Sequence, residues 1–307
     1  MRILVVGAGG IGGYYGGRLL SAGRDVTFLV RQRRAAQLAE AGLVVRSQFG
    51  DLDLPSPPTV LAEDIQSPFD LILLSCKAYD LEAAMESLAP ACGPDTLILP
   101  VLNGMRHMDL LKARFGENRV LGGLCLISVV LDPEGRVLHL NDLHGLTFGE
   151  PDGGLTPRIE AVASALTGAG FDARLSESIL QDMWEKWVFL ASLAASTSLM
   201  RTSVGNILAA PGGRDFLLGI LDECSAIAAD AGHMPGGPFF QRTRGLLTTE
   251  GSPMTASMFR DIKAGLPVEA DHVIGDLIVR ADAAKIPVPK LRTAYTHLKA
   301  YEKQRQA

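Results

Sequence analysis

Residues 3–12 read ILVVGAGGIG, an apolar run that passes directly into a glycine-rich segment. Ile3–Val6 has the composition of a buried strand, and Gly7-Ala8-Gly9-Gly10-Ile11-Gly12 follows the pattern G-x-G-x-x-G. In this pattern the first glycine allows a tight turn, the second lets the backbone approach a pyrophosphate, and the third lets the next helix pack on the strand. A helix starting here offers unpaired N–H groups and its positive dipole end to phosphates. The six residues are therefore candidates for a dinucleotide site.

The pattern is weak alone and gains weight from the residues after it. Gly23 stands where a helix would end, and Val26–Val30 reads as a second strand, which completes a strand–turn–helix–strand unit. An NAD site usually carries Asp or Glu after this second strand, to hold the ribose 2′-hydroxyl. This chain has Arg31, and a guanidinium suits a 2′-phosphate, so NADP(H) is the expected cofactor. Arg33 and Arg34 fit a solvated helix start as well as a functional role.

The rest of the first half alternates apolar runs with helical segments. Leu71–Ser75 and Leu97–Pro100 read as further buried strands, and such alternation is typical of a parallel sheet covered by helices. After about residue 120 we expect strands that extend the same sheet, partly antiparallel, separated by turns at Asp132-Pro133-Glu134-Gly135 and Asn141-Asp142, with one helix among them. These strands are expected at Val120–Val130, Arg136–Leu140, Leu146–Gly149 and Ala173–Leu175, and the helix at Thr156–Ala169.

Beyond about Ser176 only helical patterns remain. The Gly- and Pro-containing breaks between them predict helices at Ile179–Met200, Arg214–Ala231, Phe239–Thr248, Pro253–Lys263, Glu269–Ala284 and Lys290–Gln304. The expected fold is therefore α/β, with an N-terminal Rossmann-type, mainly parallel sheet domain at residues 1–175. An all-α domain at residues 176–307 follows it, and we assign cofactor binding to the first domain and substrate binding and catalysis to the second.

Composition excludes several classes of function. The net charge of −5 lacks the basic footprint of a nucleic-acid-binding protein. The four cysteines form no C-x-x-C pair and have no histidine at zinc-site spacing, so we expect no metal and a reducing compartment. No apolar run is long enough to cross a bilayer, and Gly12, Gly13 and Arg18 interrupt the N-terminal segment that could imitate a signal peptide. A cytoplasmic protein without membrane or nucleic-acid partners is expected.

Two further strand ends should line the cofactor cleft, because ligands bind at the carboxyl edge of such sheets. Lys77 follows the strand at Leu71–Ser75, and Asn103-Gly104 follows the strand at Leu97–Pro100. The lysine and the asparagine could hold the nicotinamide end of the cofactor or the substrate. They could equally be a surface lysine and an Asn-Gly turn.

Several separated motifs together resemble the ketopantoate reductase (2-dehydropantoate 2-reductase) family. They occur in family order over essentially the whole chain: the glycine loop with Arg31, Cys76-Lys77-Ala78, Asn103-Gly104-Met105, Trp184-Glu185-Lys186, Ser257-Met258-Phe259-Arg260-Asp261, and Glu269 ahead of an apolar helix. The resemblance implies NADPH-dependent reduction of a 2-oxo acid to a 2-hydroxy acid, with ketopantoate to pantoate, a step of pantothenate and coenzyme A biosynthesis, as the leading reaction.

The resemblance also implies roles for single residues. Lys186 matches the general acid, and Glu269 matches the glutamate that contacts the substrate hydroxyl and the lysine. Asn103 matches the asparagine that positions the lysine, Ser257 the serine that binds the substrate carboxylate, and Lys77 a lysine beside cofactor and substrate. A lysine aimed at the ketone oxygen would stabilise the charge that builds there and supply the proton. The substrate would lie between the two domains.

The chain departs from the family pattern on one helix face. The family carries asparagines four and eight positions after its lysine, where this chain has Leu190 and Ala194. Ser192, Ser196 or Ser198 could compensate, but helix geometry does not place Ser192 on that face, so we expect a more apolar or differently shaped substrate pocket. Two alternatives therefore stand beside ketopantoate: a dehydrogenase for another, more apolar oxo or hydroxy acid, and a non-catalytic NADP(H)-sensing protein. Trp184 and Trp187 could shield the site from water, although packing between the domains is the favoured role. The long helices of the second domain could support a homodimer or equally form one domain core.

Overall fold

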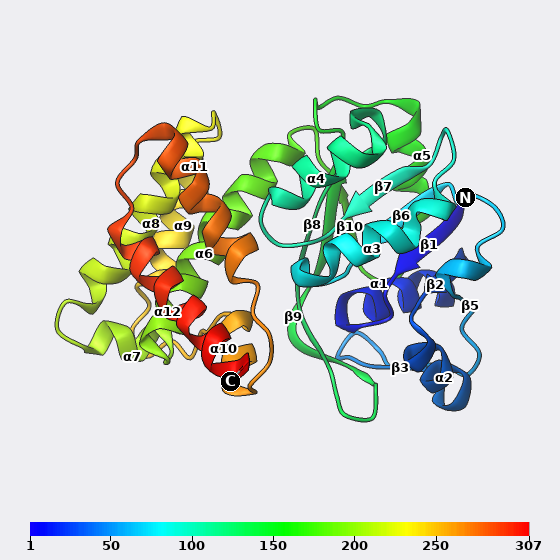
Figure 1. Ribbon diagram of the computed structural model, residues 1–307, viewed down its shortest axis with the longest axis horizontal. Coiled ribbons are helices and arrows are strands. Elements are labelled where there is room, and N and C mark those ends of the chain that lie inside the picture. The colour runs from blue at the N-terminus through cyan, green and yellow to red at the C-terminus, as the bar shows by residue number, and fades with distance from the viewer. Residues whose placement is uncertain (307) are drawn as a thin grey trace. The chain divides into compact units, whose positions relative to one another are not determined.

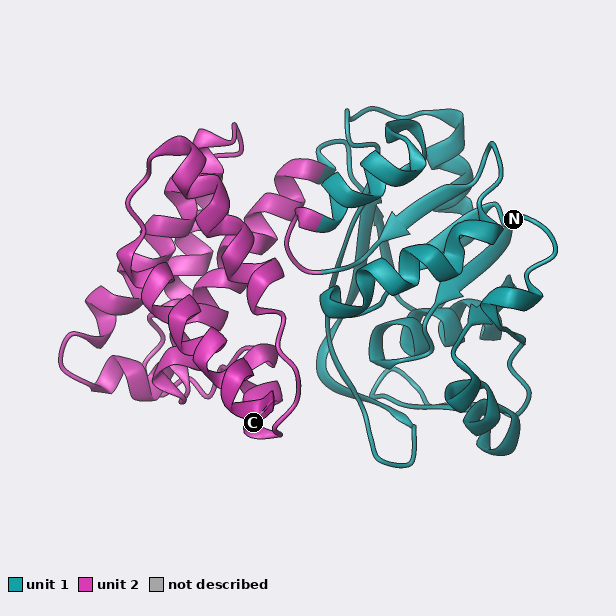
Figure 2. Cartoon of the chain, in the orientation of Figure 1, with its two compact units in different colours: residues 1–102, 107–179 teal, residues 103–106, 180–307 magenta. Residues whose placement is uncertain are grey.

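The computed structural model describes residues 1–306. The chain divides into two compact units, one made of residues 1–102 and 107–179, the other of residues 103–106 with the chain from 180 onward (Figure 2). The first unit holds all the strands of the described chain, and the second is built from helices (Figure 1). An α/β domain followed by an all-α domain is thereby confirmed.

The first sheet of the first unit is parallel throughout. Its strand order is β5-β2-β1-β6-β7, with β1 at Arg2–Val6, β2 at Asp25–Leu29, β5 at Thr59–Val60, β6 at Leu71–Leu74 and β7 at Leu97–Pro100. In this register Val6 at the end of β1 lies beside Leu29 on one side and Leu74 on the other. The carboxyl ends of the three central strands therefore come out at one edge, around the glycine loop.

The later strands correct the expectation from sequence. Instead of extending the first sheet, β8 (Gly122–Leu131), β9 (Val137–Gly149) and β10 (Asp172–Leu175) form a second sheet. Two earlier strands that the sequence did not predict, β3 (Leu43–Arg46) and β4 (Leu52–Leu54), belong to the same second sheet. A single bridge between Ile98 and Val120 links β7 to the chain that enters β8. The turn expected at Asn141-Asp142 is absent, and β9 runs through it as one strand of a long hairpin with β8.

Helix α1 (Gly10–Ser21) packs between the two sheets. Its glycines permit this on both faces. A side chain at Gly16 would come within 2.5 Å of Phe28 in β2, and one at Gly13 within 2.8 Å of Val137 in β9. Close-packed interiors have no room for such an atom. The sequence GIGGYYGG thus fixes how near the two sheets can lie to one helix.

Four more α-helices complete the first unit. They are α2 (Gln32–Ala41), α3 (Leu81–Leu88), α4 (Arg106–Phe115) and α5 (Pro157–Leu166), with single 3₁₀ turns η1 (Ala62–Asp64), η2 (Ala78–Asp80), η3 (Ala89–Ala91) and η4 (Glu117–Arg119). Thr156 caps α5, because its hydroxyl accepts a hydrogen bond from the N–H of Ile159.

The second unit contains the helices expected from sequence, one unforeseen short helix and a π-helical turn. They are α6 (Ile179–Met200), α7 (Val204–Ala209), α8 (Gly213–Asp230), α9 (Gly237–Leu247), α10 (Ser257–Lys263), the π-turn η5 (Asp271–Gly275), α11 (Asp276–Ala284) and α12 (Pro289–Gln306). The buried Glu223 of α8 accepts hydrogen bonds from the N–H groups of Lys290 and Leu291, which fixes the start of α12.

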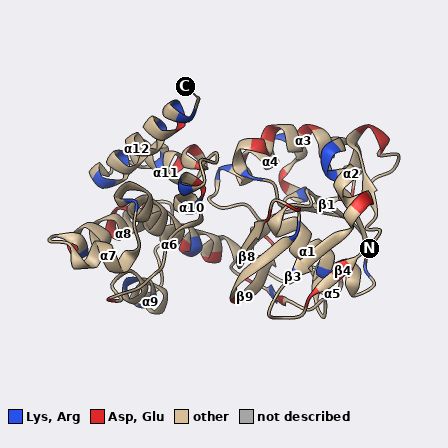
Figure 3. Cartoon of the chain, turned by 90° about the horizontal axis from the view of Figure 1, so that it is seen from below, with Lys and Arg blue, Asp and Glu red and all other residues tan. Residues whose placement is uncertain are grey.

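Acidic and basic residues are nearly balanced in number. Basic and acidic residues are interspersed on both units (Figure 3). Among the described residues, every helix is too short or too polar to span a membrane. Within residues 1–306, no group of three or more His, Cys, Asp or Glu side chains is arranged to hold a metal ion.

Candidate functional site

The glycine loop has the geometry that its pattern predicts. Gly7 adopts a positive φ of 91°, and α1 begins at Gly10 with Gly9 as its N-cap and no side-chain cap. A side chain at Gly12 would lie 2.0 Å from the carbonyl oxygen of Gly7, so only glycine lets helix and strand approach this closely. A side chain at Gly9 would meet no atom within 4 Å. The loop is therefore tight on its inner side and open beside Gly9, where the backbone of a dinucleotide site meets the pyrophosphate.

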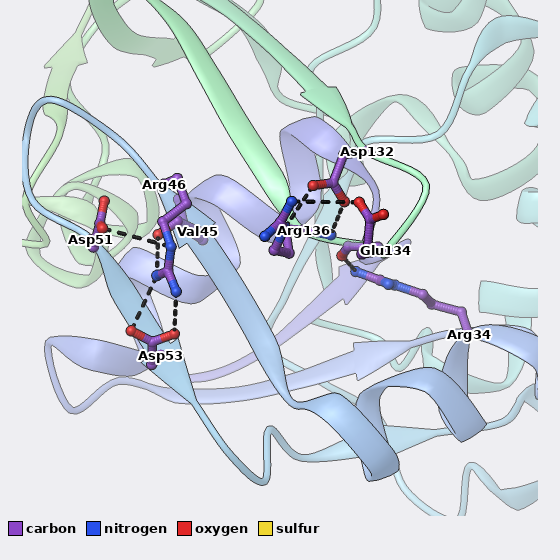
Figure 4. Close-up of polar contacts among 9 residues, drawn as sticks. Arg34, Val45, Arg46, Asp51, Asp53, Asp132, Glu134 and Arg136 are labelled. Atoms are coloured by element: carbon purple, nitrogen blue, oxygen red, sulfur yellow. Dashed lines mark hydrogen bonds and ion pairs between the residues drawn. The ribbon is translucent and has the colours of Figure 1, made fainter.

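Arg34 has a structural role in this loop. Its Nε donates to the carbonyl of Ala8 (3.0 Å), and one terminal nitrogen donates to the carbonyl of Gly135 in the turn between β8 and β9 (3.0 Å). Burial lowers the pKa of Arg34. Figure 4 shows its side chain extended towards this turn, near Glu134. Arg34 is thus not the solvated residue that one of the two interpretations of the basic segment expected, whereas Arg33 lies exposed in α2.

Arg31 is the N-cap of α2, directly after β2, and its side chain is 73% exposed. One terminal nitrogen lies 2.7 Å from Oδ1 of Asp80, in the η2 turn after β6. The hydrogen bond and the charge of Asp80 raise the pKa of Arg31. The guanidinium is thus held at the carboxyl edge of the sheet by an acidic residue that the sequence did not point to.

The segment after β6 reaches the same edge. Ser75 donates a hydrogen bond to the carbonyl of Val6, the last residue of β1, over 2.9 Å. Lys77 comes two residues later, exposed, at the start of η2. A cavity of about 510 Å³ lies elsewhere, lined by Pro94 and Asp95 ahead of β7 and by Arg119 and Arg158. It belongs to the amino end of β7, so it is not the expected cofactor site.

The second unit holds the other predicted site residues: Asn103, Lys186, Ser257 and Glu269. Lys186 is partly buried on α6, between two tryptophans that are almost fully buried. The indole N–H of Trp187 donates to the carbonyl of Val273 in the π-turn η5 (2.9 Å). This bond ties the helix turn that carries Lys186 to the segment that comes after Glu269. Both partners of the bond belong to the second unit.

His272 is a residue of this region that the sequence did not single out. It lies in η5, is 6% exposed, and forms a hydrogen bond with the backbone of Asn103. A side chain at Gly104 would come within 2.8 Å of its carbonyl oxygen, so the Asn103-Gly104 turn packs directly on it. Burial lowers the pKa of His272 to about 4, although the charge of Glu269 opposes this shift. The only sequence signal is its position one helical turn after Glu269.

Ser257 is placed through α6 as well. The hydroxyl of Thr197 accepts a hydrogen bond from the N–H of Ala256, the N-cap of α10 (3.2 Å), and Ser257 is the first residue of that helix. Ser192 and Ser196 donate to the carbonyls of Val188 and Ser192 in their own helix, over 2.7 and 2.6 Å. Both hydroxyls therefore donate their hydrogen bonds within α6.

Comparison with known proteins gives the family. Residues 3–153 match the family described as "Ketopantoate reductase PanE/ApbA", and residues 178–302 match its C-terminal part. The chain belongs to this family. It is therefore an oxidoreductase that acts on CH–OH donors, in a family that depends on NAD(P).

Three proteins show what the chain is similar to. The "Uncharacterized oxidoreductase YkpB" of Bacillus subtilis is 38% identical over 306 residues, which cover 99% of this chain and 100% of the relative. The crystal structure of 2-dehydropantoate 2-reductase from Methylococcus capsulatus is 27% identical, with a TM-score of 0.88 over 100% of this chain and 98% of that one. A ternary structure of D-mandelate dehydrogenase with NADH and anilino(oxo)acetate is 20% identical, with a TM-score of 0.88 over 100% of both chains, and shares the fold.

The residues at the first unit's sheet edge fit a dinucleotide. The space beside Gly9 and the uncapped start of α1 leave backbone N–H groups available to a pyrophosphate. Arg31 and Lys77 add positive charge at the same edge. The loop therefore offers both the hydrogen-bond donors and the electrostatics that a pyrophosphate requires.

Two glycine substitutions should separate cofactor binding from folding. Gly9→Ala meets no neighbouring atom at an ordinary φ of −82°, so the free energy of unfolding should change by no more than about 0.5 kcal/mol. Its methyl group should nevertheless block the approach of the pyrophosphate and weaken NADPH and NADH binding at least tenfold. Gly12→Ala should instead lower the free energy of unfolding by about 1–3 kcal/mol or more. Urea unfolding and calorimetric titration measure the two effects, and unchanged cofactor affinity in Gly9→Ala would contradict the site.

His272 predicts a pH dependence of stability. Its folded-state pKa of about 4 lies below the unfolded value near 6.5, so the unfolded chain binds the proton first as the pH falls. Stability should be lost between about pH 6.5 and 4, with about 2 kcal/mol lost from pH 7 to pH 5. His272→Gln keeps an N–H donor without this titration and should show a flatter profile. Denaturant unfolding at several pH values tests this, and parallel profiles for the two proteins would refute it.

Proposed function

We propose that this protein reduces a 2-oxo acid to a 2-hydroxy acid with NADPH, with ketopantoate as the leading substrate. Support comes from family membership over both parts of the chain together with the residues that the second unit gathers. The observation that carries most weight is the linkage through η5. The carbonyl of Val273 in this turn accepts a hydrogen bond from Trp187, the residue after Lys186. His272 in the same turn forms a hydrogen bond with the backbone of Asn103, and the charge of Glu269 acts on its imidazole.

The cofactor residues are proposed from the loop geometry and the family pattern. The backbone from Gly7 to Gly12 would hold the pyrophosphate, Arg31 the 2′-phosphate, and Lys77 and Asn103 the nicotinamide end. The bound cofactor supplies the hydride, so the protein itself needs neither a metal nor a nucleophile.

Lys186 is the proposed general acid. Negative charge builds on the ketone oxygen as the ketone is reduced, and an ammonium group aimed at that oxygen stabilises it and donates the proton. The carboxylate of Glu269 is suited to accept hydrogen bonds from the lysine and from the new hydroxyl. Asn103 would orient the lysine, and Ser257, at the start of α10, would donate to the substrate carboxylate.

A different substrate is the second candidate. Leu190 and Ala194 stand where the family has asparagines, and the hydroxyls of Ser192 and Ser196 are bonded within their own helix. Such a face favours a more apolar 2-oxo acid. The D-mandelate dehydrogenase that shares the fold bears the name of an aromatic hydroxy acid. A protein that only senses NADP(H) has no use for Lys186 and Glu269 together, which disfavours the sensor alternative. A cytoplasmic location and a homodimer remain parts of this proposal.

A panel of 2-oxo acids tests the reaction. NADPH oxidation should be observed with ketopantoate or, if the Leu190 face selects the substrate, with an aromatic or branched 2-oxo acid at higher kcat/KM. Lys186→Ala should lower kcat by about 10²–10⁴-fold and leave the Kd for NADPH unchanged, because the residue acts on the substrate oxygen. Lys303→Ala, at an exposed site of α12, is the control. Tight NADPH binding without turnover on any acid would favour a sensor.

The cofactor assignment has its own test. Arg31→Ala should weaken NADPH binding about 10–100-fold, the equivalent of one or two charge-assisted hydrogen bonds, and leave NADH binding nearly unchanged. Arg33→Ala removes another exposed charge, from the helix that Arg31 caps, and should change neither affinity appreciably. Calorimetric titration with both cofactors measures the effect, and equal losses of the two affinities in Arg31→Ala would mean that Arg31 does not read the 2′-phosphate.

A further inference from the structure

The ion pair between Arg31 and Asp80 connects the segments that follow two strands, β2 and β6. β2 and β6 lie on opposite sides of β1, and Arg31 follows β2 whereas Asp80 follows β6. The pair, at 2.7 Å, therefore reaches past the carboxyl end of β1, where the glycine loop begins. It lies at the edge where the ribose of a bound dinucleotide is recognised.

The two partners have opposite preferences for the cofactor. A guanidinium attracts a 2′-phosphate, whereas a carboxylate repels it and accepts a hydrogen bond from an unmodified 2′-hydroxyl. Sites usually carry one or the other. This chain carries both, already bonded to each other, with the guanidinium 73% and the carboxylate 36% exposed. Both groups are thus accessible to an incoming ribose.

We propose that Asp80 is a specificity-determining residue for the cofactor. Its carboxylate competes with a 2′-phosphate for Arg31, so that the protein binds NADH as well as NADPH and prefers NADPH only modestly. This inference rests on the proposed cofactor role of Arg31, which it extends to the selection between the two cofactors.

The strengths of the interactions set the size of the effect. An exposed ion pair changes an equilibrium constant by about fivefold at most. A bidentate contact between a guanidinium and a phosphate is stronger, so a 2′-phosphate can displace or share Arg31. The nearby carboxylate then still weakens the contact through competition and repulsion. Removing its charge should therefore tighten NADPH binding by a factor within one order of magnitude.

The decisive variant is Asp80→Asn, which keeps the shape of the side chain. In calorimetric titrations of the full-length protein, its Kd for NADPH should fall about two- to tenfold, while its Kd for NADH stays equal or rises. Asp64→Asn, an exposed aspartate of the same unit in η1, should leave both values unchanged. A ratio of the two Kd values that changes less than about twofold in Asp80→Asn overturns the proposal.

A second background separates this inference from the cofactor assignment. With Arg31→Ala present, competition for the guanidinium no longer exists, so Asp80→Asn should change the Kd for NADPH about twofold or less. An equal effect in both backgrounds would refute the competition. If Arg31→Ala loses NADPH selectively while Asp80→Asn changes nothing, only the role of Asp80 falls. If Arg31→Ala weakens both cofactors alike, the assignment of Arg31 itself is wrong.

Discussion

The close approach of α1 to strands on both of its faces is the constraint on which the first unit depends. Gly12 and Gly16 lie one turn apart and meet β1 and β2, whereas Gly13 and Gly17 lie one turn apart and meet the second sheet. A helix with larger side chains at these positions would push one sheet away from the other. Since the first turn of this helix also forms the glycine loop, the packing that joins the sheets and the geometry that suits a pyrophosphate come from the same residues.

The π-turn η5 has a comparable place in the second unit. A π-turn widens the helix by one residue, and such turns are frequent at functional sites. Here two consecutive residues bond in different directions: His272 meets the backbone of Asn103, and the carbonyl of Val273 accepts from the indole of Trp187. The segment after Glu269 therefore holds pieces of chain that are more than eighty residues apart in sequence. The buried side chains of His272 and Trp187 each have a hydrogen-bond partner on the backbone, which keeps their positions defined.

Sequence patterns predicted the local elements well and the second sheet poorly. The glycine loop, the four longer strands of the first sheet and α6 are encoded by short-range signals, namely glycine spacing, apolar runs and helix breaks, whereas the two-residue edge strand β5 was not predicted. The second sheet depends on pairings between distant segments, which leave no local pattern. Asn141 illustrates this: it looks like a turn residue, yet its side-chain oxygen accepts the N–H of Ser128 beside the irregularity between Ile127 and Val129, so the strand continues. The contacts of Arg34 and His272 could not be predicted from sequence for the same reason, because their partners lie far away along the chain.

The contacts of Arg34 have a consequence for redesign of the cofactor site. Exchange of the basic segment after β2 for that of an NAD-dependent relative is an obvious route to a changed cofactor preference. In this protein two of the three arginines in that segment have different partners. The side chain of Arg31 is exposed and pairs with Asp80. The side chain of Arg34 donates hydrogen bonds both to the carbonyl of Ala8 in the glycine loop and to the carbonyl of Gly135 at the tip of the β8–β9 hairpin. A graft that replaces both arginines would remove the hydrogen bonds between the glycine loop and the hairpin at the same time as it removes the positive charge of Arg31. An exchange of cofactor specificity therefore has to keep Arg34.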